Sequence, residues 1–296
     1  KYPECMQYQG QSPVISISLK SMKQGSYKDA FHMFKVLIAR EYDRHKVILK
    51  SGKISDSERD LFHSILTQRA EDAFYLDSIK FLSDIMVKYY NKNVIILIDE
   101  YDVPLENAFH QGFYTDMVNL IRSVFESALK TNPSLDRAFL TGCLRVSKES
   151  IFTGLNNLQI FSIMSTKFDD SFGFTQEEIN VMLECYDLTD KSSDIAHWYD
   201  GYKFNDVDIY NPWSVLNYLS EAAEKSSALC KPYWSNTSSN EIVKRLIEES
   251  NDRTKNAIEE LINGTPVRAQ IYEDITYGTT IKIKKKNKIL KIKNQI

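Results

Sequence analysis

Two adjacent carboxylates behind an apolar run are the residues best placed to do chemistry. Val94–Ile98 holds five aliphatic residues in succession, and Asp99 and Glu100 follow directly. An unbroken apolar run of this length is typical of a central parallel strand buried on both faces. Open α/β sheets bind ligands at the carboxyl ends of such strands. The sequence therefore predicts an acidic ligand site, or alternatively a core strand followed by a solvated turn.

A strand of this kind resembles the Walker B element of P-loop nucleotide hydrolases. The resemblance implies that Asp99 binds Mg²⁺ and that Glu100 is the catalytic carboxylate that polarises the attacking water. Successive side chains on a strand point to opposite faces, so both acids reach one cleft only if the backbone turns where the strand ends. Asp102, in that turn, is a candidate for nucleotide binding. Its alternative role is to organise the loop through nearby backbone amides.

A second polar group follows the next predicted strand, Arg137–Leu144. In P-loop hydrolases the strand beside Walker B often ends in a polar sensor that positions water near the γ-phosphate, and Thr141 occupies that place. Arg145 follows, and an arginine there stabilises the charge that develops on a transferring phosphoryl group. The alternative for Arg145 is a salt bridge to an acid of the turn. Both interpretations place it near the same cleft.

The surrounding pattern must position these groups. Strands are expected at Pro13–Leu19, at the central apolar run, at Arg137–Leu144 and, less distinctly, at Gln159–Met164. Helical spacing over about 27–49, 56–66, 72–90 and 113–129 separates the first three, which indicates a parallel α/β sheet. From Thr175 the pattern becomes helical, beginning with a T-x-x-E capping box that Glu178 completes. Further helices are expected at about 189–199, 212–226, 240–250 and 254–262.

Six ordered motifs identify a family. They are DEYDVP (99–104), LTGCLRVSKESIFTGLNNL (140–158), FDDSFGFTQEEI (168–179), WYDGYKF (198–204), YNPWSVLNYL (210–219) and YWSNTSSN (233–240). Over roughly residues 10–278 this series resembles the bacterial and archaeal AAA-ATPase-like family, whose members often carry a PD-(D/E)XK nuclease domain at the carboxyl end. The resemblance implies a P-loop NTPase-like sheet (1–170), a smaller helical domain (171–278) and a flexible basic tail (279–296).

The resemblance is incomplete in two respects. No G-x-x-x-x-G-K-[ST] phosphate loop (Walker A) occurs in the chain, so the sequence is expected to begin partway into the ATPase core. The residues after 278 are also too few for a nuclease domain, so none is expected within this sequence. Because the missing loop supplies the amide cradle, the lysine and a Mg²⁺-binding hydroxyl, ATP and Mg²⁺ are expected to bind only where a Walker A is supplied.

Composition restricts the remaining classes. The 296 residues contain four widely spaced cysteines and no run of about 18 apolar residues, so a soluble cytoplasmic protein without membrane contact is expected. Net charge is −3, but the tail holds seven lysines and no acid. The remaining acidic body argues against a broad nucleic-acid surface there. The histidines and cysteines show no zinc spacing, so Mg²⁺ is the only metal predicted.

Two functions follow from these observations. The first is an ATP-binding and ATP-hydrolysing module, a switch or motor linked to a nuclease, for which nucleic acid would be reached through the nuclease partner or a missing domain. The second is a non-enzymatic interaction module that keeps the fold without turnover. The sequence leaves open the substrate, the oligomeric state and the role of the tail.

Overall fold

The computed structural model describes residues 3–143, 151, 152, 155, 157–225, 227–233, 247, 248, 250–263, 265 and 267. These residues divide into two compact units, one ending at Leu158 and the other beginning at Gln159. The predicted extents of the domains, 1–170 and 171–278, stay predictions, because much of the chain after Tyr233 lies outside the described residues. Within the described ranges, no helix combines the length and apolar character needed to cross a membrane.

Unit 1 is built on a parallel three-stranded sheet. Its strands are β1 (Val14–Ser18), β2 (Val94–Asp99) and β3 (Leu135–Leu140), in the order β1-β2-β3. Ile17 lies beside Ile98 and Ile98 beside Leu140, so the three strands end at the same edge. The predicted α/β class and the central place of the Val94–Ile98 strand are both confirmed.

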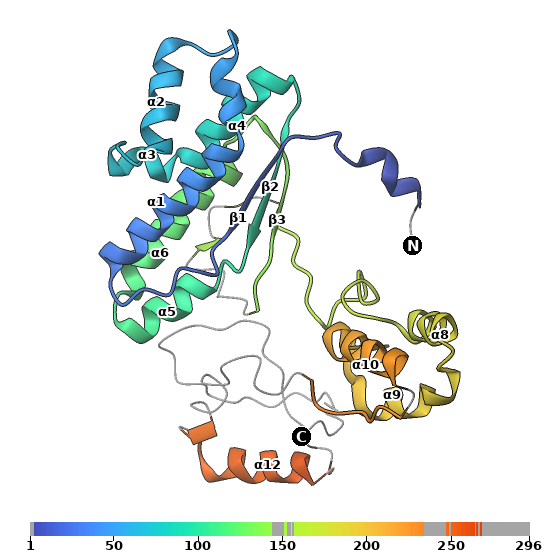
Figure 1. Cartoon of the computed structure of the whole chain (residues 1–296). Coiled ribbons are helices and arrows are strands. Elements are labelled where there is room, and N and C mark those ends of the chain that lie inside the picture. Colours follow the sequence, from blue (N-terminus) through green and yellow to red (C-terminus); the bar gives the residue numbers. More distant parts are fainter. Residues whose placement is uncertain are drawn as a thin grey trace. The chain divides into compact units, whose positions relative to one another are not determined.

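Helices connect these strands and cover the sheet from one side (Figure 1). Buried residues of α1, α4 and α6, such as Phe34, Ile85 and Ile121, join the inward residues of the strands in one apolar core. Ser26 caps α1 by accepting from the Asp29 amide, and Ser55 forms a full capping box at α2. The helices are α1 (Tyr27–Arg44), α2 (Asp56–Leu66), α3 (Asp72–Leu76), α4 (Ser78–Tyr90), α5 (Val103–Gln111) and α6 (Tyr114–Phe125), with 3₁₀ turns at Pro3–Tyr8 and Lys46–Lys50 and a π turn at Glu126–Lys130.

The expectation that the central strand is buried on both faces is wrong for the part of the chain described. Val94, Ile96 and Ile98 are at most 2% exposed, whereas Leu97 is 36% exposed and Phe139, beside it on β3, is 56% exposed. The reason is the two-residue period of a strand combined with helices on one side only. The apolar run therefore predicted a strand of a sheet correctly, but it did not show whether one face of that sheet is covered or both.

Unit 2 is mainly helical and has its own core. Tyr199, Tyr210 and Tyr218 are buried there together with Leu183 and Val215. The predicted capping box is confirmed, since the Thr175 hydroxyl accepts from the Glu178 amide at the start of α8. The elements are α8 (Gln176–Cys185), a 3₁₀ turn (Thr189–Lys191), α9 (Ser192–Tyr199), β4 (Asp200–Phe204), β5 (Val207–Tyr210), α10 (Pro212–Glu224) and α12 (Asp252–Ile262).

One sequence expectation fails in unit 2. Residues 159–164 form irregular structure rather than a strand. The segment that contains Gly201 is strand β4, which pairs with β5 in an antiparallel hairpin. The turn of the hairpin lies at Asn205, whose φ of +50° is the left-handed conformation that asparagine tolerates. The helix expected over 240–250 falls largely outside the described residues.

Candidate functional site

The Asp99 carboxylate lies at the carboxyl edge of the sheet, between hydroxyl groups from both neighbouring strands. Ser18, at the end of β1, donates to Asp99 Oδ2 at 3.3 Å. Thr141, directly after β3, donates to Asp99 Oδ1 at 2.5 Å. The ladder brings them together, because Ser18 pairs with Asp99 in the β1–β2 register and the Thr141 amide donates to the Ile98 carbonyl at 2.9 Å. All three side chains belong to the face of the sheet that the helices leave uncovered.

Glu100 occupies the sharp turn that follows. Its φ of +52° is left-handed, a conformation that costs a residue other than glycine about 1–2 kcal/mol. Strained backbone of this kind is concentrated at functional sites. The Glu100 carboxylate lies 3.8 Å from Lys20 Nζ, whose side chain is 74% exposed, so this ion pair is weak and readily broken. Glu100 is therefore held beside Asp99 but remains available to a ligand.

Asp102 lies beneath this edge rather than on it. It is 2% exposed and immediately precedes α5, where its carbonyl accepts the amides of Leu105 and Glu106. The loop leaving β3 closes over it: a Cβ at Gly142 would stand 2.6 Å from Asp102 Oδ1. This position favours the loop-organising role for Asp102 over direct nucleotide contact.

The electrostatic field at the strand ends is negative. Burial raises the pKa of the Cys143 thiol, and the nearby carboxylates of Asp102, Glu100, Glu106 and Asp99 raise it further. A field that disfavours a thiolate disfavours a bare phosphate for the same reason and attracts a cation. Phosphate could therefore approach only together with positive charge.

The ligand atoms at Asp99 suit one kind of cation. Asp99, Ser18 and Thr141 present only oxygen, which is what Mg²⁺ prefers, and Mg²⁺ commonly keeps several waters while using one or two carboxylates. Among the described residues, no group of three or more His, Cys, Asp and Glu side chains could hold a metal ion. The site therefore fits a hydrated Mg²⁺ held partly by a phosphate ligand, and not a fully protein-ligated ion.

The predicted site residues differ in how the structure places them. Asp99 and Thr141 are in direct contact, Glu100 follows Asp99, and Arg145 lies outside the described residues, so its place at the site stays a prediction. Sequence reasoning missed Ser18 and Lys20. The signal was present in the alternation of Val14–Ser18, whose serines fall on the same face as Asp99, but a serine at a strand end is too common to stand out.

Comparison with known proteins identifies the family of the chain. A curated protein of Azotobacter chroococcum mcd 1, described as an uncharacterized protein in the vnfD 5′ region, is 28% identical over 147 residues, which are 49% of this chain and 27% of that protein. The chain thus matches only about a quarter of that relative's length. No solved structure matches significantly. The family model described as Predicted AAA-ATPase matches residues 1–152, which include all three strands of the parallel sheet and the residues that directly follow them. The chain therefore belongs to this AAA-ATPase-like family.

Proposed function

We propose that the carboxyl edge of the β1-β2-β3 sheet is the metal-binding and water-activating half of an ATP-hydrolysing site. The observation that carries the proposal is the Asp99 carboxylate held between Ser18 and Thr141, with Glu100 next to it in a strained turn. Family membership supports nucleotide and Mg²⁺ binding in general. The link to a nuclease rests on the sequence resemblance alone, and a cytoplasmic location rests on the composition of the chain.

Each side chain has a distinct role in this proposal. Asp99 would hold the hydrated Mg²⁺, which when bound neutralises phosphate charge, while Ser18 and Thr141 fix the orientation of the carboxylate. Glu100 would accept a proton from the attacking water as the water oxygen bonds to the γ-phosphorus and the bond to the bridging oxygen breaks. Arg145 would stabilise charge on the transferring group. Lys20 competes for Glu100 through a weak ion pair that substrate would displace.

The proposal limits what these 296 residues do by themselves. The chain contains no phosphate loop, and the negative field at Asp99 opposes phosphate unless positive charge is added. We expect ATP·Mg²⁺ to bind weakly or not at all in a calorimetric titration at physiological salt. Saturable binding at low micromolar concentration that Asp99→Ala abolishes would contradict this expectation, and would mean that another loop supplies the phosphate cradle.

The metal half of the site can be tested separately with Mn²⁺ as a paramagnetic substitute for Mg²⁺. Mn²⁺ added at millimolar concentration should broaden the amide signals of Ser18, Asp99 and Thr141, and Asp99→Asn should remove the effect. The matched control is Asp136→Asn, an exposed acid on β3 at the opposite end of the sheet. Equal broadening in the wild type and in Asp99→Asn would refute the assignment of Asp99.

One observation favours the second candidate, a non-enzymatic interaction module. Leu97 and Phe139 form an exposed apolar strip on the uncovered face of the sheet, and such strips commonly bind other protein segments. The two candidates differ in a simple respect. A G-K-[ST] phosphate loop in the reading frame upstream of Lys1 would favour hydrolysis, and its absence would favour the interaction module.

A further inference from the structure

An aromatic pocket of unit 2 lies where the β4–β5 hairpin meets the loop before α8 and the start of α10. We propose that this aromatic pocket binds a proline-rich segment of a partner protein, with an arginine or lysine of that segment beside it. The proposal is independent of the nucleotide chemistry of unit 1, because all residues that line the pocket belong to unit 2. It rests on the lining of the pocket, the polar groups at its rim and the charge around it.

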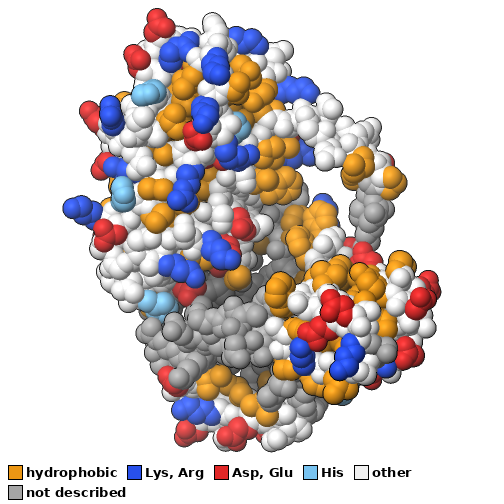
Figure 2. All heavy atoms as spheres, in the orientation of Figure 1, with side chains coloured by type: hydrophobic (Ala, Val, Ile, Leu, Met, Phe, Trp, Pro, Cys, Tyr) orange, Lys and Arg blue, Asp and Glu red, His pale blue; other side chains and the backbone are white. Residues whose placement is uncertain are grey.

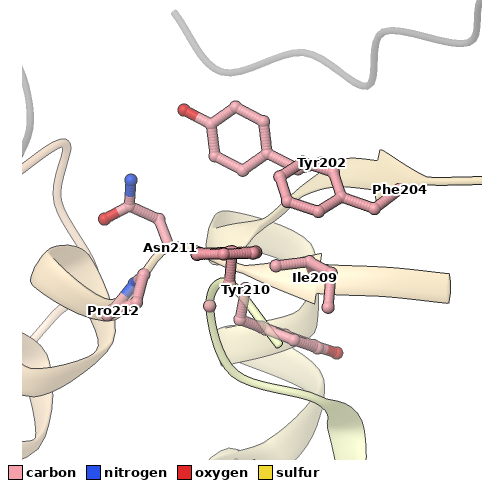
Figure 3. A pocket seen from close by; sticks show the side chains of 8 residues that line it. Tyr202, Phe204, Ile209, Tyr210, Asn211 and Pro212 are labelled. Atoms are coloured by element: carbon pink, nitrogen blue, oxygen red, sulfur yellow. The ribbon is translucent and has the colours of Figure 1, made fainter. Parts of the chain in front are cut away.

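Aromatic rings form much of the pocket wall. The pocket encloses about 290 Å³, and Phe172, Tyr202 and Phe204 line it together with Ile209 and Pro212. Figure 3 shows the rings of Tyr202 and Phe204 facing the space above Ile209, with Pro212 across it. Phe172 is 67% exposed and Tyr202 is 46% exposed, so a large apolar surface is left open to a partner. The volume lies near the lower end of the roughly 300–1,000 Å³ of typical ligand pockets, which suits one or two small rings rather than a large cofactor.

Backbone contacts fix the shape of the aromatic pocket. Phe174 and Tyr210 exchange backbone hydrogen bonds of 3.2 and 2.8 Å, which hold the loop before α8 against β5. Gly173 allows this approach, because its φ is +120° and a Cβ there would stand 2.3 Å from Ile209 Cγ2. Tyr202 lies opposite Ile209 in the β4–β5 register. The walls are therefore held in place without a ligand, and such preorganisation lowers the cost of binding.

Two hydrogen-bond donors stand at the rim. Asn211 Oδ1 accepts from the Ser214 amide at 3.0 Å, which caps α10 and leaves Asn211 Nδ2 as a donor. Among the described residues, neither Asn211 Nδ2 nor the Tyr202 hydroxyl has a hydrogen-bond partner. Figure 3 shows both groups on the side of the space away from Ile209. A ligand that fits therefore carries acceptors at the rim and apolar groups inside the pocket.

A proline-rich segment has this combination of groups. The proline ring is apolar and its nitrogen carries no hydrogen, so it brings no donor into the almost wholly apolar lining. In the polyproline II conformation the backbone carbonyls form no internal hydrogen bonds and stay available as acceptors. An α-helix uses these carbonyls internally, and an extended strand adds N–H groups that the apolar lining would leave without partners. Aromatic-lined grooves are a recurring way of binding proline-rich segments.

The charge around the aromatic pocket favours a basic residue in the partner. Burial, together with the carboxylates of Asp200 and Asp208, raises the pKa of Tyr210 to about 12. Asp208 lies 3.7 Å from Lys203 Nζ, but both side chains are more than half exposed, so a ligand can replace this weak pair. Residues 159–233 contain thirteen Asp and Glu against five Lys, and Figure 2 shows acidic side chains directly beside hydrophobic ones on unit 2. This field attracts an arginine or lysine next to the prolines.

The 296 residues themselves contain no proline-rich segment. Their seven prolines are each isolated in the sequence, and the lysine-rich residues 279–296 contain no proline. We therefore assign the ligand to a second protein.

Fluorescence anisotropy of a labelled peptide tests the proposal on the full chain. The peptide Pro-Pro-Leu-Pro-Pro-Arg should bind saturably, and the amide signals of Phe172, Gly173 and Asn211 should shift most in NMR spectra. Tyr202→Ala should raise the Kd at least ~tenfold, because buried tyrosines commonly dominate such interfaces. Tyr186→Ala, at another exposed tyrosine of unit 2 outside the pocket, is the matched control and should leave the Kd unchanged. Equal Kd values for the wild type and Tyr202→Ala, or no saturable binding, would overturn the proposal.

Matched peptides separate the contributions and guard against misfolding of the Tyr202→Ala variant. A peptide with glutamine in place of arginine should bind about two- to fivefold more weakly, and Asp208→Asn should remove that difference. A peptide with alanine in place of the prolines should not bind; equal binding would mean that charge alone attracts the ligand, and the assignment to a proline-rich segment would be wrong. Shifts confined to amides outside the pocket would exclude it even if Tyr202→Ala fails to fold. Dimers in sedimentation without peptide binding would assign the pocket to a second copy of this chain and overturn the proposal.

Discussion

Replacing Glu41 by alanine should destabilise unit 1 by about 3 kcal/mol, although Glu41 is far in the sequence from Asp99 and Glu100. Glu41 is only 3% exposed and lies in the last turns of α1. Its carboxylate accepts from the Ser16 amide at 2.9 Å, from Arg44 Nη1 at 2.6 Å and from His45 Nε2 at 3.2 Å. It therefore binds the outer edge of β1 to α1, two residues before Ser18.

The magnitude follows from what each partner loses. Removing one member of a buried charged network typically costs about 3–5 kcal/mol, because the remaining groups are left buried without a partner. The lower end applies here because Arg44 has a half-exposed side chain and can return to water. Glu41→Gln keeps an acceptor oxygen of the same size and loses only the charge. We expect about 1–2 kcal/mol for that change.

The pH dependence provides a second measure of the same network. Burial raises the pKa of Glu41, but hydrogen bonds from His45, the Ser16 amide and Arg44 outweigh it, so the folded pKa lies below the ordinary value of 4.5. A lowered folded pKa means that the contribution to stability is complete above the unfolded pKa and is lost as pH falls through the folded value. The wild type should therefore lose stability below about pH 5 more steeply than Glu41→Gln.

Urea denaturation with two optical probes separates the units. No tryptophan occurs before Leu158 in the sequence, and Trp198 and Trp213 lie in α9 and α10 of unit 2. Their fluorescence therefore reports on unit 2, while far-UV circular dichroism reports on both units. With a slope of about 2 kcal/mol per M, Glu41→Ala should move the unit 1 transition by ~1.5 M and leave the fluorescence midpoint unchanged. Glu71→Ala, at an exposed acid of the same unit, is the control. A shift of the same size in Glu71→Ala, or no shift in Glu41→Ala, would refute the reasoning.

Two further substitutions test local geometry. Gly142→Ala places a Cβ 2.6 Å from the buried Asp102 carboxylate and should lower the free energy of unfolding by about 1–3 kcal/mol in urea denaturation. Gly25→Ala is the control, because nothing lies within 4 Å of that Cβ, and it should change the stability little. Equal effects of the two substitutions would mean that the loop at Gly142 shifts without cost. Thr175→Ala removes the hydroxyl that accepts from the Glu178 amide and so caps α8, and it should lower the stability of unit 2, followed by tryptophan fluorescence, by ~1 kcal/mol. Thr175→Ser keeps a hydroxyl and should retain the wild-type stability. A serine variant as unstable as the alanine variant would exclude the capping explanation.

Much of the architecture was predictable because it depends on local rules. The parallel order of the three strands follows from an apolar run flanked by strand–helix alternation, and the capping boxes at Ser55 and Thr175 follow from residue types three apart. The uncovered sheet face was not predictable in the same way. Leu97 and Phe139 have the same residue types whether a helix covers them or not, so one-dimensional patterns carry no information about the second face.

The hairpin β4–β5 shows a different limit. Its strands are five and four residues long, too short for a clear period, and Gly201 is a residue type that favours a turn. The actual turn uses Asn205, an equally ordinary signal four residues later. Pairing between the strands decided between these two candidate turns, and pairing is a contact between segments rather than a property of either one.

The carboxyl edge of the sheet at Asp99 depends both on a local sequence pattern and on contacts between distant segments. Asp99 and Glu100 were identifiable because they follow the apolar run, but a carboxylate at a strand end is informative only once its partners are known. Those partners, Ser18 and Thr141, are 81 and 42 residues away in the sequence. Thr141 was recognisable only through the resemblance to the sensor of P-loop hydrolases, and the Ser18 hydroxyl is too common at a strand end to be recognised. The register of the parallel sheet places one of them on each oxygen of Asp99. The carboxylate is thus fixed in orientation, in a negative field that accepts a cation more readily than a bare phosphate. At this edge Lys20 supplies one positive charge, 3.8 Å from Glu100, through an exposed and weakly held side chain. Phosphate chemistry here therefore depends on further positive charge.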